Sequence, residues 1–381
     1  MKTYALIGTA MLVLALGCGG SGDTTTPTSS KASLTIYLGS NSDPDLQQAV
    51  VSVDSVDISA NGSSWASVGS PKTTYDLMTL QGAQPALVSQ APVSGGTYYF
   101  RITWATTNYK DGARPPAYVY AAGEATGHSV PMPATTTFTG TVTVPAGGSK
   151  AVVLTLDPAT TFLRIQGTAT TYAFNSMGMA LDNDGLAAIQ GTVTSGSTAL
   201  GGTEVLAEVV DGFGDPHILQ RTTCNAAGQY SLDLLPTNLG GSAPYVYVVA
   251  MPSNGAQAFP AQGVGPYHLD TPGAVVTGAD LDFSGLATSA SITLTVNPQT
   301  PAAGLTVADL RQYLAFGVAT QYLIVRSHAT TIGTTQDTYK FAGLGTGYYG
   351  VLATRGDAQE ATLSQVLVNP GDSANVTLTF P

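Results

Sequence analysis

The chain has little cysteine and little charge. Two of its 381 residues are cysteines, and Asp, Glu, Lys and Arg together make up 10%. The folded domains of such a chain must be held by apolar cores and strand ladders rather than by disulfides. There are 13 basic against 24 acidic residues, the net charge is −11, and no window holds a basic cluster. Nucleic acid is therefore disfavoured as a partner on electrostatic grounds.

Motifs that carry catalysis are also missing. The chain has no His-Glu-x-x-His, Gly-x-Ser-x-Gly, Asp-Thr-Gly or phosphate-binding loop, and its four histidines are isolated in sequence. His217 lies near Asp211 and Asp215 and could mark a metal corner, but we favour a turn there. Residues 182–185 (DNDG) resemble a calcium loop without its downstream Glu, and we interpret them as a turn too. We therefore expect no catalytic residue, no metal and no cofactor.

No apolar run near the start is long enough to span a bilayer. Residues 5–16 give about a dozen residues, where ~20 are needed, and they follow the positive Lys2. Such a run, ending in small residues, predicts a secretory signal peptide over residues 1–17. Its end, LALGC, resembles the bacterial lipobox, where a peptidase cuts before a cysteine that carries diacylglycerol. The resemblance implies lipidation of Cys18, and the alternative is an ordinary signal peptide with an incidental cysteine.

The predicted lipid makes the membrane a partner of the protein. Acyl chains on Cys18, palmitate among them, would anchor it stably, because each buried CH₂ contributes ~0.8 kcal/mol. In bacterial lipoproteins Asp after the cysteine favours the inner membrane, so Gly19 implies the outer membrane, facing the periplasm or the surface. Residues 18–33 are mostly Gly, Ser, Thr and Pro and predict a flexible linker.

The rest of the chain predicts an all-β fold. Short runs of Thr, Val, Tyr and Ile are punctuated by Gly and Pro. Within residues 49–59 the apolar positions change from odd to even, which predicts a β-bulge near Ser55. Trp104 ends an alternating apolar strand, so core packing is favoured over sugar stacking. Cys224 is predicted to be a small buried hydrophobe, with a reactive thiol as the alternative.

Two internal echoes indicate repeated modules. Residues 142–156 align without gaps with residues 366–380, and both predict a strand, a tight turn with Gly and a second strand. A Gly-x-Tyr pattern ahead of an alternating run occurs three times, in residues 95–102, 226–234 and 345–353. Three occurrences predict three tandem β-sandwich-like modules.

One helix is predicted among the strands. Thr306 and Asp309 have capping-box spacing, and Leu305 and Leu310 take the staple positions. We therefore expect a short helix near residues 307–316 that crosses over a sandwich.

Parts of the chain resemble known families. Residues from about 33 to 161 resemble a bacterial lipoprotein domain catalogued as domain of unknown function 4382, on the stretches SLTIYL, AVVSVDSVDIS, YDLMTLQG and PVSGGTYYFRI. That family has no established activity, so the resemblance implies only a fold and a location in the cell envelope. Residues 188–283, with IQGTVTSGSTALGG and TTCNAAGQYSLDLLP, resemble the carboxypeptidase-regulatory-like, transthyretin-type β-sandwich. Residues 290–381 are similar to it more weakly.

These observations predict five segments. They are the signal peptide (1–17), the lipidated cysteine and linker (18–33), the lipoprotein domain of unknown function (34–185), the carboxypeptidase-regulatory-like sandwich (186–286) and a C-terminal sandwich (287–381).

The predicted function is non-enzymatic. A lipid-anchored protein of this build would be a binding, adhesion or scaffold component of the bacterial envelope, with an envelope protein or a glycan as partner. One alternative is a carbohydrate-binding accessory protein of the cell surface, in which either Trp65 or the tyrosines around Tyr118 and Tyr120 stack on sugars. A second alternative is a hydrolase with a dispersed site.

Overall fold

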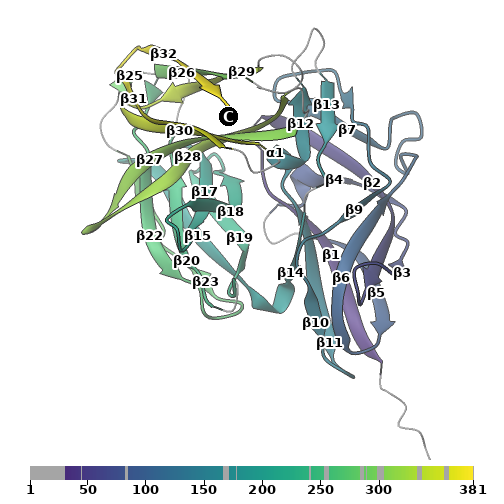
Figure 1. Cartoon of the computed structure of the whole chain (residues 1–381). Helices are drawn as coiled ribbons and strands as arrows, with labels where there is room; N and C mark the ends of the chain where they lie inside the picture. Colours follow the sequence, from purple (N-terminus) through teal and green to yellow (C-terminus); the bar gives the residue numbers. More distant parts are fainter. Residues whose placement is uncertain are drawn as a thin grey trace, which may run out of the picture.

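The computed structural model shows a chain built almost entirely of strands (Figure 1). It describes residues 31–43, 45–81, 85–165, 171–176, 178–239, 242–252, 257–283, 287–288, 290–297, 304–332, 337–355 and 360–380. Within these residues the only α-helix is the single turn α1 (Pro158–Thr161), which Asp157 caps by accepting from the Ala159 N–H. The predicted all-β fold of three sandwich-like modules is confirmed. No helix among the described residues is long and apolar enough to cross a membrane.

The N-terminal sandwich sets the pattern that the other two repeat. In one sheet β1 (Ala32–Ser40) lies between an antiparallel β5 (Ala86–Val93) and a parallel β11 (Ser149–Leu156), with β14 (Met179–Asp182) beyond β11. The facing sheet is centred on β2 (Leu46–Ser59) and β6 (Gly96–Trp104), and β10 (Val142–Val144) pairs with β6. Its remaining strands are β3 (Ala66–Gly69), β4 (Thr73–Asp76), β7 (Ala117–Ala121), β8 (His128–Ser129) and β9 (Thr135–Thr137).

The middle and C-terminal sandwiches have the same central pairings. In the middle one β15 (Leu186–Ser195) lies between antiparallel β19 (Gln229–Pro236) and parallel β24 (Leu281–Asp282). In the C-terminal one β26 (Ala290–Asn297) lies between antiparallel β29 (Asp337–Leu344) and parallel β32 (Ser373–Thr379). The facing sheet of the middle sandwich is β18 (Pro216–Thr223), β17 (Glu204–Val210), β20 (Tyr245–Ala250) and β22 (Gln262–His268). That of the C-terminal sandwich contains β28 (Ala319–Ile332), β27 (Gly304–Phe316), β30 (Gly347–Arg355) and β31 (Glu360–Val368).

The two similar segments, residues 142–156 and 366–380, form the same structural unit in two sandwiches. They form β10 to β11 and β31 to β32, and in each segment the two strands belong to opposite sheets of one sandwich. The turns between them contain Gly147 and Gly371, whose φ angles of 69° and 82° favour glycine. The Gly-x-Tyr pattern is less uniform, because it opens the equivalent strands β6 and β30 but falls on β19, in the other sheet, in the middle sandwich.

The predicted helix near residues 307–316 is wrong, because this segment is strand β27. The strand pairs with β28 on one side and with β30 on the other, so its backbone groups are satisfied across the sheet. Its buried Ala308, Leu310, Leu314 and Phe316 all lie at even positions, which is the period of a strand. Capping-box spacing is a local signal, and two flanking strands override it.

Three local predictions are confirmed. The pairing of β2 with β6 shifts register between Val53 and Ser55, where the bulge was expected. Trp104 is 4% exposed in the core, and its indole N–H donates to Thr136 Oγ1 at 2.8 Å. Cys224 is a buried free thiol in the core of the middle sandwich, and burial raises its pKa to about 12.

The middle and C-terminal sandwiches share one apolar core. Val249 and Met251, at the end of β20, belong to the same cluster of buried side chains as Leu310 and Tyr349 of the C-terminal sandwich. Tyr247 of β20 also packs edge-on against Phe316 of β27, with ring centroids 4.8 Å apart. The two sandwiches are therefore held together by the same force that holds each one folded.

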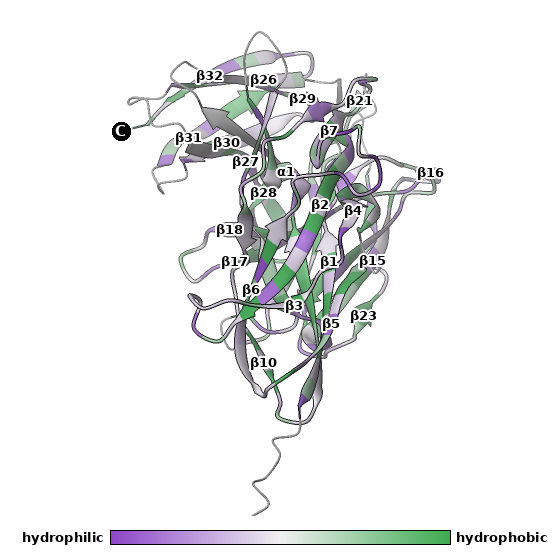
Figure 2. Cartoon of the chain, turned by 90° about the vertical axis from the view of Figure 1, so that its right-hand side faces the viewer, coloured by the Kyte–Doolittle hydropathy of each residue, from purple (hydrophilic) through white to green (hydrophobic). Residues whose placement is uncertain are grey.

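A hairpin ties the N-terminal sandwich to the C-terminal one. It consists of β12 (Phe162–Ile165) and β13 (Thr171–Phe174), and its aromatic side chains enter the N-terminal core, where Phe174 packs 5.5 Å from Trp104. Its backbone joins the C-terminal sheet, because β12 pairs in parallel with β28 through Arg164 and Thr330. Figure 1 shows this hairpin between the two sandwiches, and Figure 2 shows hydrophobic residues recurring along β2 in the sandwich that it enters.

Candidate functional site

A cavity of about 540 Å³ opens where the three sandwiches meet. We call it the junction pocket. Its lining comes from the β1–β2 and β7–β8 connections, from β12 and β13, from β17 and β18, and from β28 and β29. It is lined by Asp43, Asp45, Glu124, Phe162, Arg164, Tyr172, Glu204, Arg221, Met251, Arg326, Ser327, His328, Tyr339 and Lys340, among others. Cavities of this size accommodate small ligands.

The N-terminal wall of the junction pocket is acidic. The chain leaves β1 and turns before β2, and the Asp45 N–H donates to Asp43 Oδ1 at 2.9 Å, which closes the turn. Asp43 is 9% exposed, and burial together with the nearby charge of Asp45 raises its pKa to about 7. Burial also raises the pKa of Asp45, and the charge of Glu204 adds to this. At neutral pH the carboxyl group of Asp43 is therefore only partly ionised.

A buried ion network from the middle sandwich forms the floor. Arg221 of β18 is 5% exposed. Its Nη1 lies 3.3 Å from Glu204 Oε1, and its Nε lies 3.4 Å from Asp157 Oδ2, next to α1. Burial raises the pKa of Asp157, and the charge of Arg221 opposes that rise. The network therefore joins the middle sandwich to the N-terminal part of the chain.

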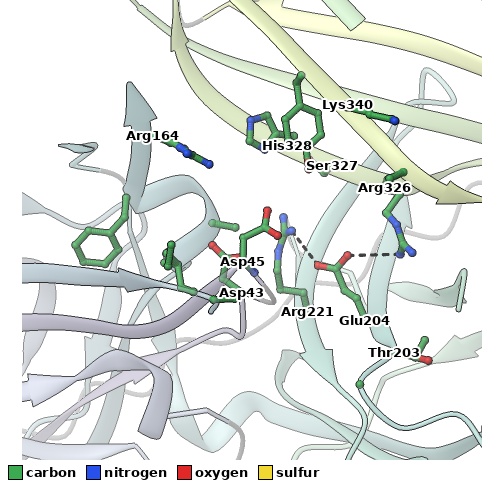
Figure 3. A pocket seen from close by; sticks show the side chains of 18 of the residues that line it. Asp43, Asp45, Arg164, Thr203, Glu204, Arg221, Arg326, Ser327, His328 and Lys340 are labelled. Carbon is green, nitrogen blue, oxygen red and sulfur yellow. Dashed lines mark hydrogen bonds and ion pairs between the residues drawn. The ribbon is translucent and has the colours of Figure 1, made fainter. Parts of the chain in front are cut away.

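The C-terminal wall is basic. Arg326 of β28 donates from Nη2 to the Met251 carbonyl at 2.5 Å, and its Nη1 lies 3.9 Å from Glu204 Oε2. His328, two residues along β28, stacks on Tyr339 with ring centroids 3.4 Å apart. Burial and then the charge of Arg164 lower the pKa of His328 to about 4, so its ring is neutral at pH 7. Figure 3 shows Arg164 and His328 on one side of the cavity and Asp43 and Asp45 on the other.

The structure brings the predicted Tyr118 and Tyr120 together, with ring centroids 5.9 Å apart, but Trp65 lies elsewhere on the same sandwich. Trp65 precedes β3 beside the Ile58 end of β2, whereas Tyr118 pairs with Val50 near the other end. Eight residues of strand correspond to about 26 Å. Tyr118 is 9% exposed and Tyr120 is half-buried, and Arg114 Nη1 donates to Tyr120 Oη at 3.2 Å.

Trp65 is covered in part by a cation. The Arg101 guanidinium lies 4.5 Å from the centre of the Trp65 ring, and its Nη2 is held 2.8 Å from Asp57 Oδ2. The face of the ring that Arg101 covers is not open to a sugar. Cys18, the predicted lipidation site, lies outside the described residues.

In the two turns whose spacing resembles a metal site, the carboxylates have other partners. Asp211 Oδ1 accepts the N–H groups of Phe213 and Asp215, and these bonds and that to His217, 3.1 Å away, lower the Asp211 pKa to about 2. No cluster of ligating side chains that could hold a metal ion occurs in the described ranges.

In the DNDG turn a lysine takes the place that a cation would have. Lys150 Nζ lies 2.7 Å from Asp182 Oδ2 and 3.1 Å from Asp184 Oδ2. The turn interpretation therefore accounts for both carboxylates.

The residues of the junction pocket were missed by motif search because they are scattered along the chain. One available signal was the scarcity of basic residues: Arg164, Arg221, Arg326 and Lys340 are four of only 13 in the whole chain, and all four line one cavity. Scarce charges that meet in a fold indicate a site, but only a three-dimensional structure shows the meeting.

Residues 31–175 match the family described as "Domain of unknown function (DUF4382)". No curated protein matches the chain. Among solved structures, it is similar to the Bacillus anthracis TIE protein, at 12% identity over 92% of this chain and 51% of that one, with a TM-score of 0.21. It is also similar to a Streptococcal ancillary pilin (9% identity, 92% and 99% covered, TM-score 0.21). A third is a putative cell adhesion protein from Bacteroides ovatus ATCC 8483 (11% identity, 51% and 94% covered, TM-score 0.17). The chain thus spans about half the length of the TIE protein.

Proposed function

We propose that the protein is a lipid-anchored, non-enzymatic component of the bacterial cell envelope. In this proposal acyl chains on Cys18 hold it at the outer membrane, and residues 18–33 form a flexible linker. The three sandwiches then act as one body that binds, adheres or serves as a scaffold, with an envelope protein or a glycan as its partner.

One observation carries the proposal: the sandwiches are joined to one another in three independent ways. Met251 lies in a core shared by the middle and C-terminal sandwiches. The β12–β13 hairpin places its side chains in one sandwich and its backbone ladder in another. Arg221 links Asp157 to Glu204 across the remaining contact. A body with a fixed shape on a flexible linker is suited to presenting a surface, because the linker lets it reach a partner and the body need not be ordered on binding.

Mass spectrometry of the mature protein tests the anchor. We expect a chain that begins at Cys18 with diacylglycerol on its thiol, and that sediments with the outer membrane. Cys18→Ala should move the protein to the soluble fraction, whereas the matched control Cys224→Ala should leave it with the membrane. A mature chain that begins elsewhere, or that carries no acyl group, would contradict the proposal.

A further inference from the structure

The charges of the junction pocket are segregated by module. The side chains from the N-terminal sandwich are acidic: Asp43, Asp45 and Glu124. Those from β12 and the C-terminal sandwich are basic: Arg164, Arg326 and Lys340. The middle sandwich supplies Glu204 and Arg221, which pair with each other at 3.3 Å. The pocket therefore has a negative wall, a positive wall and a floor that is neutral overall.

On the negative wall one carboxylate is left for a ligand. Glu124 Oε2 lies 2.6 Å from His128 Nε2, and Asp43 Oδ1 accepts the Asp45 N–H. Asp45 is different, because its carboxylate has no hydrogen-bond or ion-pair partner in the described part of the chain. It is solvent-accessible and lines the cavity. A carboxylate in such surroundings favours a cationic partner.

On the positive wall the donors suit an anion. A guanidinium has five N–H donors in a plane that matches a carboxylate. Arg326 uses Nη2 on the Met251 carbonyl and directs Nη1 towards Glu204 from 3.9 Å. Lys340 is exposed, and Arg164 reaches the cavity from β12 (Figure 3). His328 adds no charge at neutral pH.

We infer that the junction pocket binds a small zwitterion of the amino-acid or short-peptide class. Its ammonium group would lie against Asp45 and Asp43, and its carboxylate against Arg164, Arg326 and Lys340. The rings of Phe162, Tyr172 and Tyr339 line the remainder and would contact the apolar part of the ligand. The segregated charges carry this inference, because a zwitterion presents a cation to the acidic wall and an anion to the basic wall at the same time, and the Asp45 carboxylate has no hydrogen-bond or ion-pair partner among the described residues. The inference does not depend on the lipid anchor.

Calorimetric titration of the full-length protein in detergent tests it. The probe is trialanine, compared with N-acetyl-trialanine, which lacks the ammonium group, and trialanine amide, which lacks the carboxylate. We expect trialanine to bind, and each blocked form to bind about tenfold more weakly or not at all, because each lacks the charged group that would face one of the two walls.

Two variants test which wall of the pocket contacts the ammonium group of the ligand and which contacts its carboxylate. In Asp45→Asn, we expect trialanine to bind about tenfold more weakly and N-acetyl-trialanine to lose its disadvantage. In Lys340→Gln, we expect trialanine to bind about tenfold more weakly and trialanine amide to lose its disadvantage. Both side chains are accessible, so neither change should lower the unfolding midpoint. The controls Asp270→Asn and Lys110→Gln change exposed residues outside the pocket and should leave binding unchanged.

Three outcomes would overturn the inference. One is the absence of binding heat with trialanine. A second is binding of glycerophosphoethanolamine without binding of trialanine, which would point to a phosphate zwitterion instead. The third is equal affinity for trialanine and both blocked forms, since the charged walls would then play no part. The result is independent of mass spectrometry at Cys18, so failure of either proposal can be told from failure of the other.

Discussion

The two contacts that the middle sandwich makes with its neighbours differ in kind. Towards the C-terminal sandwich it shares an apolar core, in which Val249 and Met251 are fully buried. Towards the N-terminal sandwich its contact includes a polar network, in which Arg221 is held between Asp157 and Glu204 beside a cavity. An apolar contact is non-directional and excludes water, whereas a buried ion network is stable only while every member is paired.

The contact with the C-terminal sandwich, called the apolar joint below, therefore differs in purpose from the contact with the N-terminal sandwich, called the polar joint, which borders the junction pocket. Between the middle and C-terminal sandwiches the main force is the burial of apolar side chains, which itself does not depend on pH or on a ligand. At the N-terminal contact, charge and protonation matter because desolvation shifts the titration of the acidic groups. The following experiments, ordered from the largest expected effect to the smallest, break one joint or the other.

Removing the central cation should have the largest effect. Arg221→Met removes the cation that lies between the half-buried Asp157 and Glu204. Of these two, only Glu204 keeps another cation close by among the described residues, Arg326. We expect a loss of about 3–5 kcal/mol in the free energy of unfolding. Urea denaturation at pH 7 measures it. The control Arg114→Met removes a partly exposed arginine and should cost less than about 1 kcal/mol. Equal losses in both variants would show that the Arg221 network contributes no more to the free energy of unfolding than an exposed arginine does.

Truncating the apolar joint should cost slightly less. Met251→Ala removes a fully buried side chain whose sulfur lies 3.5 Å from Tyr349 Oη, and we expect a loss of about 2–5 kcal/mol. Unlike Arg221→Met, the loss should be nearly the same at pH 5 and pH 8. The control Met179→Ala changes a side chain that is 40% exposed. A loss at Met251 that varies strongly with pH would contradict an apolar joint.

Part of the pH dependence of stability should come from the polar joint. Because the pKa of Asp43 rises from 3.8 to about 7 on folding, the folded state holds more protons than the unfolded state between these values. Stability should therefore fall as pH rises from about 4 to 7, by at most about 1.4 kcal/mol per unit from this group.

The variant Asp43→Asn isolates this contribution. The slope of unfolding free energy against pH should become smaller but not vanish, since burial also raises the pKa values of Asp157 and Asp309. An unchanged slope would show that Asp43 titrates normally.

The smallest effect is expected at a buried acid in the apolar joint. Glu208 is fully buried, and its Oε2 accepts the Ile324 N–H at 3.0 Å while its Oε1 has no partner in the structure as described. Burial raises its pKa well above the usual value, because the buried site disfavours the charged form. Glu208→Gln should therefore change stability by less than about 1 kcal/mol at pH 7 in urea denaturation. A large loss would indicate an ionised Glu208.

Short-range patterns predicted the parts of this fold that depend on one strand. The change of face near Ser55 indicated the bulge, and alternation around Trp104 indicated its burial. The segment 307–316 was mispredicted because its capping spacing is local, whereas the strand is decided by two partners distant in sequence. The similarity of residues 142–156 to residues 366–380 indicated a repeat. It did not indicate that the two strands of each copy lie in opposite sheets of a sandwich.

The junction pocket could not be predicted in this way. Asp45 is a turn residue, Arg221 lies in one strand among many, and Arg326 follows a run of buried apolar residues. Their chemistry arises only when three modules and one hairpin meet. No periodicity or spacing in the sequence encodes the arrangement of one folded module against another.

The distance between the N-terminal and C-terminal sandwiches tests the central claim, which is that the joints fix the modules in one arrangement. Spin labels at Ala113→Cys and Val318→Cys lie on exposed residues, and the buried Cys224 would remain unlabelled. Pulsed electron paramagnetic resonance on the full-length protein should give one narrow distance distribution. A broad distribution, or several separate distances, would show that the sandwiches move independently and would contradict the account.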